Sequence, residues 1–263
     1  METLANLSPL EQLRAGRLRR RVLQLLVGLV LYGASMAMMV QSFLGLDPWD
    51  VLHFGIAGFV PLSFGTVVIV VGLFALLLWI PLRQRPGLGT IANALVIGLA
   101  TDATLLVLDR PEALWARIVL LLGGVVLNGL AGALYIGAQL GPGPRDGLMT
   151  GLARRTGWSL RLVRTGLELT VLTAGWLLGG VVGVGTLLYA LAIGPLVQLF
   201  LPHVVVRLDD PRSASAEECP PGSASDRPAP DGGERTPHSA GLDASSATSG
   251  MRSATEVTTC VGR

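Results

Sequence analysis

The segment GLDPWDVLHF at residues 45–54 shares a sequence pattern with the segment GPGPRDGLMT at residues 141–150, which lies 96 residues later in the chain. Both copies follow the pattern Gly-x-x-Pro-x-Asp, whose fixed residues are Gly45, Pro48, Asp50, Gly141, Pro144 and Asp146. Glycine ends a preceding helix, proline suits the first turn of a new one, and aspartate in that turn complements the helix dipole. Each copy therefore predicts a helix break followed by a short helix, over 50–59 and 146–155. These helices are too short to span a bilayer, so we expect them to be interfacial or re-entrant.

The same offset of 96 residues aligns the flanking sequence without a gap. Upstream, Gly28, Leu31, Gly33 and Ala37 fall on Gly124, Leu127, Gly129 and Ala133. Downstream, Gly87-Leu88-Gly89-Thr90 falls on Gly183-Val184-Gly185-Thr186. Matched glycines, prolines, aspartates and threonines at one constant offset indicate an internal duplication, with one repeat over 22–108 and the other over 114–206.

The composition indicates that the solvent of this chain is a lipid bilayer. Of the 263 residues, 51% are hydrophobic and only 14% are charged, whereas a soluble domain usually carries about 25% charged residues. Six apolar stretches are long enough to cross a hydrocarbon core of about 30 Å as helices. They are 22–44, 61–82, 88–108, 114–140, 160–180 and 182–202.

The placement of arginine predicts the orientation of these spans, because cytoplasmic loops are enriched in positive charge. Eleven arginines fall in the N-terminal arm 1–21 and in the loops after the second and fourth spans, against two in the loops on the other side. Both termini are therefore expected to be cytoplasmic. After about residue 208 the chain is polar, and the segment 208–263 is expected to be a disordered cytoplasmic tail.

Three spans per repeat is an odd number, so the second repeat enters the membrane in the opposite direction to the first. The sequence thus predicts an all-α membrane protein of six helices, built from two inverted three-helix repeats. Inverted repeats are common in secondary transporters, in which the two halves exchange conformations around one site. The alternative is a duplication that serves only the stability of the fold.

Several polar residues lie in or beside the predicted spans, where a charge costs about 2.5–3.5 kcal/mol on insertion scales. They are Asn93, Asp102, Arg164 and Glu168. Together with Asp50, Asp146, Thr90 and Thr186, these are candidates for a substrate path or binding site. The alternatives are structural: Asp50, Asp146 and the two threonines cap helices, Asp102 snorkels to the interface, and Arg164 and Glu168, four residues apart, pair with each other.

The sequence gives no support for metal binding, a cofactor or catalysis. Cys219 and Cys260 lie in the tail without metal-ligand spacing, so no metal, cofactor or catalytic residue is expected. The chain carries no nucleotide fingerprint, metalloprotease helix or nucleophile elbow. An enzyme is therefore not expected.

A resemblance to a known family rests on three segments. They are GLDPWDVLH at 45–53, WIPLRQRPGLGT at 79–90, and the continuation through Asn93, Gly98 and Asp102. This set resembles the YczE/YitT-type bacterial integral membrane proteins over about residues 20–206, with the tail outside. The resemblance implies a multi-span protein of the inner membrane and supplies neither a reaction nor a substrate.

Two functions follow as hypotheses. The first is a secondary-type transporter or exporter of a small molecule, and the second is a membrane scaffold or partner of a biosynthetic or regulatory complex. The expected partners are the lipid bilayer and, for a transporter, a small-molecule substrate, but not nucleic acid. A homo-oligomer is compatible with the sequence.

Overall fold

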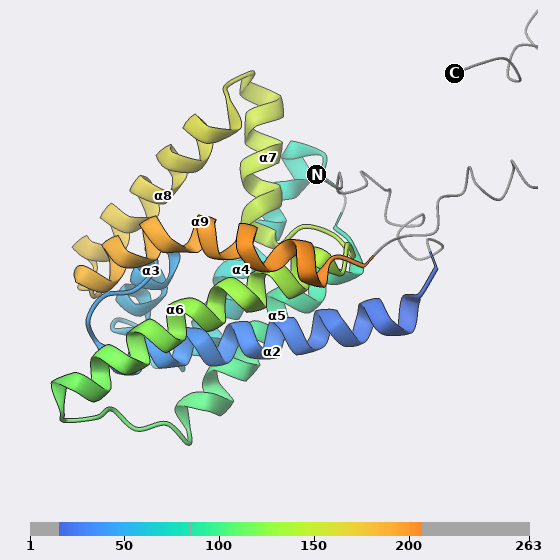
Figure 1. Ribbon diagram of the computed structural model, residues 1–263. Coiled ribbons are helices and arrows are strands. Elements are labelled where there is room, and N and C mark those ends of the chain that lie inside the picture. The colour runs from blue at the N-terminus through green and yellow to red at the C-terminus, as the bar shows by residue number, and fades with distance from the viewer. Residues whose placement is uncertain (1–15, 85, 207–263) are drawn as a thin grey trace, which may run out of the picture. The chain divides into compact units, whose positions relative to one another are not determined.

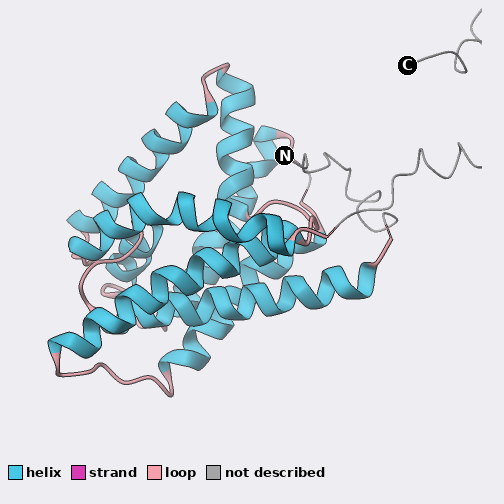
Figure 2. Cartoon of the chain, in the orientation of Figure 1, coloured by secondary structure: helices cyan, strands magenta, loops and turns pink. Residues whose placement is uncertain are grey.

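The computed structural model describes residues 16–84 and 86–206, which lie within the unit Met1–Glu218 of the chain (Figure 1). These residues form eight α-helices and no strand (Figure 2). The predicted tail over 208–263 and most of the predicted arm over 1–21 lie outside the described residues.

The helices follow the same order in both repeats. The first repeat contains α2 (Leu18–Ser42), α3 (Pro48–Ala57), α4 (Phe64–Leu82) and α5 (Leu88–Leu105). The second contains α6 (Leu114–Gly137), α7 (Pro144–Thr156), α8 (Leu160–Leu177) and α9 (Val184–Val204). Each predicted span holds one of the six long helices, and the two predicted short helices are α3 and α7.

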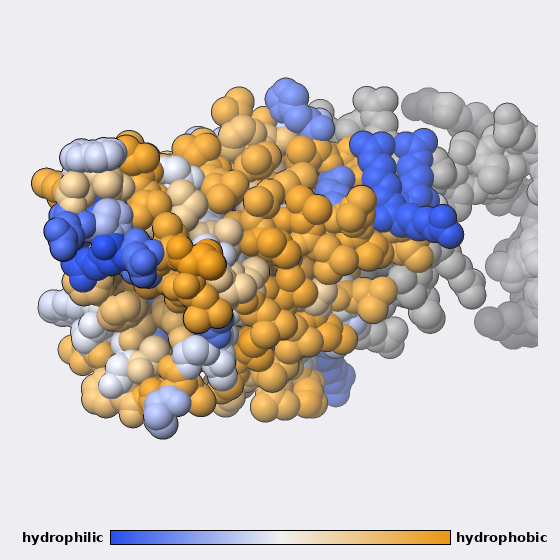
Figure 3. Space-filling model, turned by 90° about the horizontal axis from the view of Figure 1, so that it is seen from below, coloured by the Kyte–Doolittle hydropathy of each residue, from blue (hydrophilic) through white to orange (hydrophobic). Residues whose placement is uncertain are grey.

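The surface and the helix lengths are those of a multi-pass helical membrane protein. Within the described residues, α2, α5, α6 and α9 are long and apolar enough to cross a bilayer, and α4 is apolar over Phe64–Trp79. Helix α8 is long enough but carries Arg161, Arg164 and Glu168. Large apolar side chains lie exposed along most of the long helices, and Figure 3 shows a broad apolar face between charged patches.

Helices α2 and α6 lie side by side and antiparallel at the centre of the fold (Figure 1). Arg21, at the start of α2, donates to the carbonyls of Ala138 and Gln139 just beyond the end of α6, at 2.9 and 2.7 Å. Arg117, at the start of α6, donates to the carbonyls of Ser42 and Phe43 at the end of α2, at 2.7 and 3.0 Å. Donors and acceptors in the two sets are 96 residues apart, so the same contact is made twice.

The Gly-x-x-Pro-x-Asp breaks also have matching backbones. Phe43 and Gln139 end α2 and α6 in the left-handed region, with φ of 51° and 53°. Gly45 and Gly141 follow with φ of 127° and 117°, a conformation that glycine adopts without steric cost.

Each break holds the start of a helix from the other repeat. The amide of Gly185 donates to the carbonyl of Leu44, and the amide of Gly89 donates to the carbonyl of Leu140, both at 2.9 Å. Thr90 and Thr186 cap these helix starts, because their hydroxyls accept from the amides of Gly87 and Gly183.

The two repeats differ in how their last two helices pack. Helices α4 and α5 pack closely, with Gly65 against Gly98, and a Cβ at Gly98 would overlap the carbonyl oxygen of Gly65. Helices α8 and α9 make almost no such contact, and a Cβ at Gly194, the counterpart of Gly98, would meet open space. In Figure 1, α8 and α9 meet at the 178–183 turn and diverge from there.

This difference predicts opposite effects of one substitution at two matched positions. We expect Gly98→Ala to destabilise the protein by about 1–3 kcal/mol, because the added methyl group forces α4 and α5 apart. We expect Gly194→Ala to leave stability unchanged or to raise it by up to about 1 kcal/mol, because alanine is the better helix former. The thermal midpoint of the purified protein in detergent measures both effects. Equal midpoints for the two variants would contradict the packing described here.

Candidate functional site

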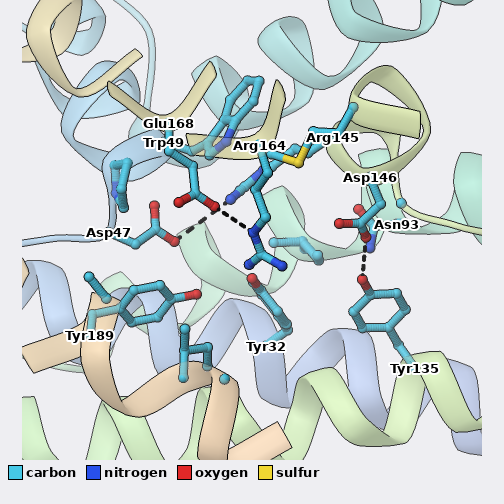
Figure 4. Close-up of a pocket in the computed structure, with 17 residues that line it drawn as sticks. Tyr32, Asp47, Trp49, Asn93, Tyr135, Arg145, Asp146, Arg164, Glu168 and Tyr189 are labelled. Atoms are coloured by element: carbon cyan, nitrogen blue, oxygen red, sulfur yellow. Dashed lines mark hydrogen bonds and ion pairs between the residues drawn. The ribbon is translucent and has the colours of Figure 1, made fainter. Parts of the chain in front are cut away.

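A cavity of about 320 Å³ lies between α2, α6 and α9 on one side and α3, α7 and α8 on the other, with α5 also contributing to its lining (Figure 4). Its volume is at the lower end of the range for small-molecule pockets. Among its lining residues are Tyr32, Asp47, Pro48, Trp49, Asn93, Tyr135, Arg145, Asp146, Met149, Arg164, Glu168 and Tyr189. Residues of both repeats thus share one polar pocket inside an apolar protein.

Three tyrosines, one each from α2, α6 and α9, lie in a row along one side of the pocket (Figure 4). The hydroxyl of Tyr135 donates to Oδ2 of Asp146 at 2.6 Å. The hydroxyl of Tyr189 donates to Oδ1 of the buried Asn128 at 3.1 Å. The side chain of Asn128 in turn donates to Ser35 Oγ at 2.9 Å, which fixes this part of the wall to α2.

A buried cluster of charged groups joins the two helix breaks. Arg145, in the first turn of α7, lies 3.7 Å from Oδ2 of Asp47 and 4.0 Å from Oδ1 of Asp50. Asp47 is the N-cap of α3, where its Oδ1 accepts from the amide of Asp50 at 2.7 Å. His53, one turn further along α3, lies with its Nδ1 3.1 Å from Oδ1 of Asp50. The cluster therefore ties α3 of the first repeat to α7 of the second.

The titration of this cluster is shifted by its removal from water. Burial, together with the neighbouring Asp50, raises the pKa of Asp47 to about 6, and Arg145 acts in the opposite direction. Burial raises the pKa of Asp50 to about 7, although Arg145 acts in the opposite direction. Burial also lowers the pKa of His53 to about 3. His53 is therefore neutral near pH 7, and its Nδ1 shares a hydrogen bond with Oδ1 of Asp50.

Three buried polar atoms have no hydrogen-bond partner within the described part of the chain. They are Oδ2 of Asp47, Oδ2 of Asp50 and Nε1 of Trp49. Buried polar groups are hydrogen-bonded in the great majority of cases, so each exception requires an explanation. Asp47 and Trp49 line the pocket, and a molecule bound there could supply the missing donor and acceptor.

Arg164 and Glu168 pair with each other, as their spacing predicts, with Nε to Oε1 at 2.9 Å. Both side chains also line the pocket, where α8 diverges from α9. Their counterparts in the first repeat are Val68 and Gly72 on the α4 face that packs against α3 and α5. The pair thus stands where the first repeat has a closed apolar contact.

The structure brings together some of the predicted site residues and separates others. Asn93, Asp146, Arg164 and Glu168 line the pocket, and Asp50 lies directly behind Arg145. Asp102 does not line it; its carboxylate accepts from Ser63 Oγ at 2.5 Å and from the amide of Gly65 at 2.7 Å. Thr90 and Thr186 also lie outside the pocket, at the helix starts that they cap.

Sequence reasoning missed the three tyrosines, Asp47, Trp49 and Arg145. One signal could have found two of the tyrosines: Tyr32 and Asn128 occupy matched positions, and so do Asn93 and Tyr189. At each matched pair one repeat has tyrosine and the other asparagine, so each repeat contributes one residue of each type. Asp47 and Arg145 have no such match, because their counterparts are Gly143 and Trp49.

Within the described residues, no group of three or more His, Cys, Asp or Glu side chains is arranged to hold a metal ion. The pocket combines aromatic faces, paired guanidinium and carboxylate groups, and unpaired hydrogen-bonding atoms. This arrangement can bind a small polar or charged molecule.

The raised pKa values predict that stability falls with rising pH. A carboxyl group with a raised folded-state pKa contributes stability at low pH that is lost as pH rises through the folded value, here about 6 to 7. We expect the thermal midpoint in detergent to fall between about pH 5 and pH 8, and Asp50→Asn to flatten this dependence. Asp109→Asn, at an exposed aspartate, is the matched control and should keep the wild-type slope. Parallel slopes for all three proteins would contradict the assignment.

Comparison with known proteins gives a consistent result. A family model described as a family of unknown function (DUF6198) matches residues 19–202. A Haemophilus influenzae protein, described as an uncharacterized protein, is 43% identical over 184 residues, which cover 70% of this chain and 84% of its own length. No solved structure matches this chain.

Two relatives are found in Bacillus subtilis. The uncharacterized membrane protein YczE is 32% identical over 201 residues, which cover 74% of this chain and 93% of its own length. The uncharacterized protein YyaS is 26% identical over 185 residues, covering 68% of this chain and 90% of its own length. The similarity to YczE agrees with the resemblance drawn from the sequence motifs.

Proposed function

We propose that this chain, which belongs to the DUF6198 family of unknown function, is a secondary-type transporter that carries a small polar solute through the pocket between its two halves. The observation that carries the proposal is the unequal packing of two matched helix pairs beside that pocket. Helices α4 and α5 are closed together, whereas α8 and α9 are apart. In this proposal the pocket residues bind and release the solute without changing it chemically.

The proposal takes all six long helices as membrane spans and the two repeats as inverted copies. The antiparallel packing of α2 on α6 and the matched arginine contacts support an axis between these helices, in the plane of the membrane. The alternation of arginine-rich loops supports an inner-membrane orientation with both termini in the cytoplasm. The pocket then lies near the axis, as binding sites of inverted-repeat transporters do.

The two matched helix pairs lie toward opposite sides of the membrane in this orientation. Gly65 and Gly98 close α4 on α5 near the outer end of α4. Helices α8 and α9 diverge from the 178–183 turn toward the start of α8, which is its inner end, and Arg164 and Glu168 of α8 line the pocket. The structure then corresponds to a state that is closed outside and open inside.

In this proposal Asp102 stabilises the close packing of α4 on α5 at the outer side of the membrane. It holds the start of α4 against α5 through Ser63 and Gly65. The matched positions in the second repeat are Ser159, Arg161 and Gln198. In the proposed state that is open outside and closed inside, the side-chain carbonyl of Gln198 would accept hydrogen bonds from the Ser159 hydroxyl and the Arg161 backbone amide in the same way.

The inverted arrangement predicts that matched loops face opposite sides of the membrane. In a background with Cys219 and Cys260 replaced by serine, we expect Phe59→Cys to react with an impermeant maleimide from outside the cell. We expect Trp158→Cys to react only from the cytoplasmic side. Both native side chains are exposed, at 71% and 62%. Labelling of both thiols from one side would overturn the inverted arrangement, and transport by exchange of halves with it.

Cysteine labelling at Ala94 and Ala190 tests whether the pocket opens alternately to the two sides of the membrane. The two alanines occupy matched positions in α5 and α9. Ala190 lines the open pocket, whereas Ala94 is 4% exposed and packs against Gly72 of α4. In inverted vesicles we expect Ala190→Cys to react rapidly. In spheroplasts we expect Ala94→Cys to react slowly, at a rate that does not rise with reagent concentration, because opening of α4 from α5 limits the reaction.

The two alanines control for each other, since the same substitution is made at the same repeat position. Labelling of the denatured variants confirms that both thiols are present and reduced. If Ala94→Cys stays unlabelled for hours until denaturant is added, the chain does not alternate. That outcome favours a membrane scaffold without transport.

A further inference from the structure

We propose, building on the proposed transport function, that the solute is an organic ammonium ion, held by Asp47 among the aromatic rings of Tyr32, Trp49 and Tyr189. The solute also carries an oxygen acceptor within reach of the Trp49 indole. Two unpaired atoms, the charge of the lining and the aromatic wall each support this assignment.

The first support is the pairing state of Asp47. Its carboxylate is 1% exposed, and only Oδ1 is hydrogen-bonded, to the amide of Asp50. Oδ2 lies 3.7 Å from the Arg145 guanidinium, beyond hydrogen-bond distance. Burying a carboxylate oxygen without a hydrogen-bond donor costs free energy. An ammonium ion in the pocket would offset that cost, either by donating an N–H or, when the nitrogen is fully methylated, through its positive charge.

The second support is the balance of charge around the cavity. Three carboxylates line it, from Asp47, Asp146 and Glu168, against the two guanidinium groups of Arg145 and Arg164. Asp50 adds a further carboxyl group directly behind Arg145. An anionic solute would increase the excess of negative charge, whereas a cation would reduce it.

The third support is the aromatic wall. Tyr32 and Tyr189 lie on one side of the pocket, and Figure 4 shows the Asp47 carboxylate directed toward them. Trp49, 7% exposed, already has the Arg145 guanidinium 5.4 Å from its ring centre, so its face accepts a cation in this structure. Aromatic faces around a carboxylate are the chemistry that recognises ammonium groups.

The unpaired Nε1 of Trp49 further limits the chemical class of the solute. An indole N–H is only a donor, so its partner must be an acceptor such as a hydroxyl, carbonyl or ether oxygen. A solute with an ammonium nitrogen and an oxygen a few bonds away satisfies both unpaired atoms at once. The cavity volume of about 320 Å³ limits this solute to a small molecule.

Equilibrium binding to the purified full chain tests the proposal without requiring flux. The probes are choline and ethanolamine, together with a panel of small amino alcohols. The comparison compounds are 3,3-dimethylbutanol, which is the neutral carbon isostere of choline, and propionate. We expect at least one ammonium probe to bind about tenfold or more tightly than its neutral isostere, with no binding of propionate.

Two variants assign this binding to the site. Asp47→Asn keeps the helix cap, because asparagine caps as well as aspartate, and should reduce the affinity for the ammonium probe to that of the isostere. Asp109→Asn removes an exposed aspartate outside the pocket and should leave the affinity unchanged. Tyr189→Phe should retain more affinity than Tyr189→Leu, since only phenylalanine keeps the aromatic face.

Three results would overturn the proposal: equal affinity for the neutral isostere, an unchanged affinity in Asp47→Asn, or no binding by any cation of the panel. The outcome is separable from that of the transport proposal. Cation binding with an unreactive Ala94→Cys would retain the ammonium site and remove transport. Labelling of Ala94→Cys without cation binding would retain alternation and remove the ammonium solute.

Discussion

The carbonyl groups left unpaired where α2 and α6 end constrain the rest of this fold. In water such groups are hydrated, but inside a membrane protein they need donors from the chain. Arg21 and Arg117 supply those donors, each reaching from the start of one central helix to the end of the other. Two helix breaks thereby become stable deep in the protein, and the two halves are held together at both ends of the central pair.

The position of the polar pocket follows from these breaks. Each break turns the chain into a short helix whose first residues face the other half, so Asp47 of α3 and Arg145 of α7 lie on one shared cavity. Their matched positions hold Gly143 and Trp49, so neither charge has a charged counterpart in the other repeat. A duplicated scaffold therefore carries an asymmetric site, and the symmetry of the backbone does not extend to its chemistry.

The sequence predicted the elements of the fold better than it predicted the site. Apolar length located the long helices within a few residues, and Gly45, Pro48, Gly141 and Pro144 located both breaks, because these residues act locally. The spacing of Arg164 and Glu168 predicted their pairing for the same reason. The partners of Asp47 and Tyr189 lie about 100 and 61 residues away in the chain, and no local pattern reveals such contacts. The divergence of α8 from α9 was not predicted, although α8 has Arg161, Arg164 and Glu168 where α4 has Gly65, Val68 and Gly72.

One difference between the repeats affects the relative populations of the two proposed states. Gly65 lets α4 touch α5 directly, but its counterpart is Arg161, whose Cβ prevents an equally close approach of α8 to α9. In the proposed cycle the two closures therefore differ in free energy, and the cytoplasm-facing form is the more populated one without solute. The population of a binding-competent form scales its apparent affinity. In that proposed cycle the half-saturating concentration would be lower on the inner side of the membrane than on the outer side, while the solute gradient alone still decided the direction of net flow.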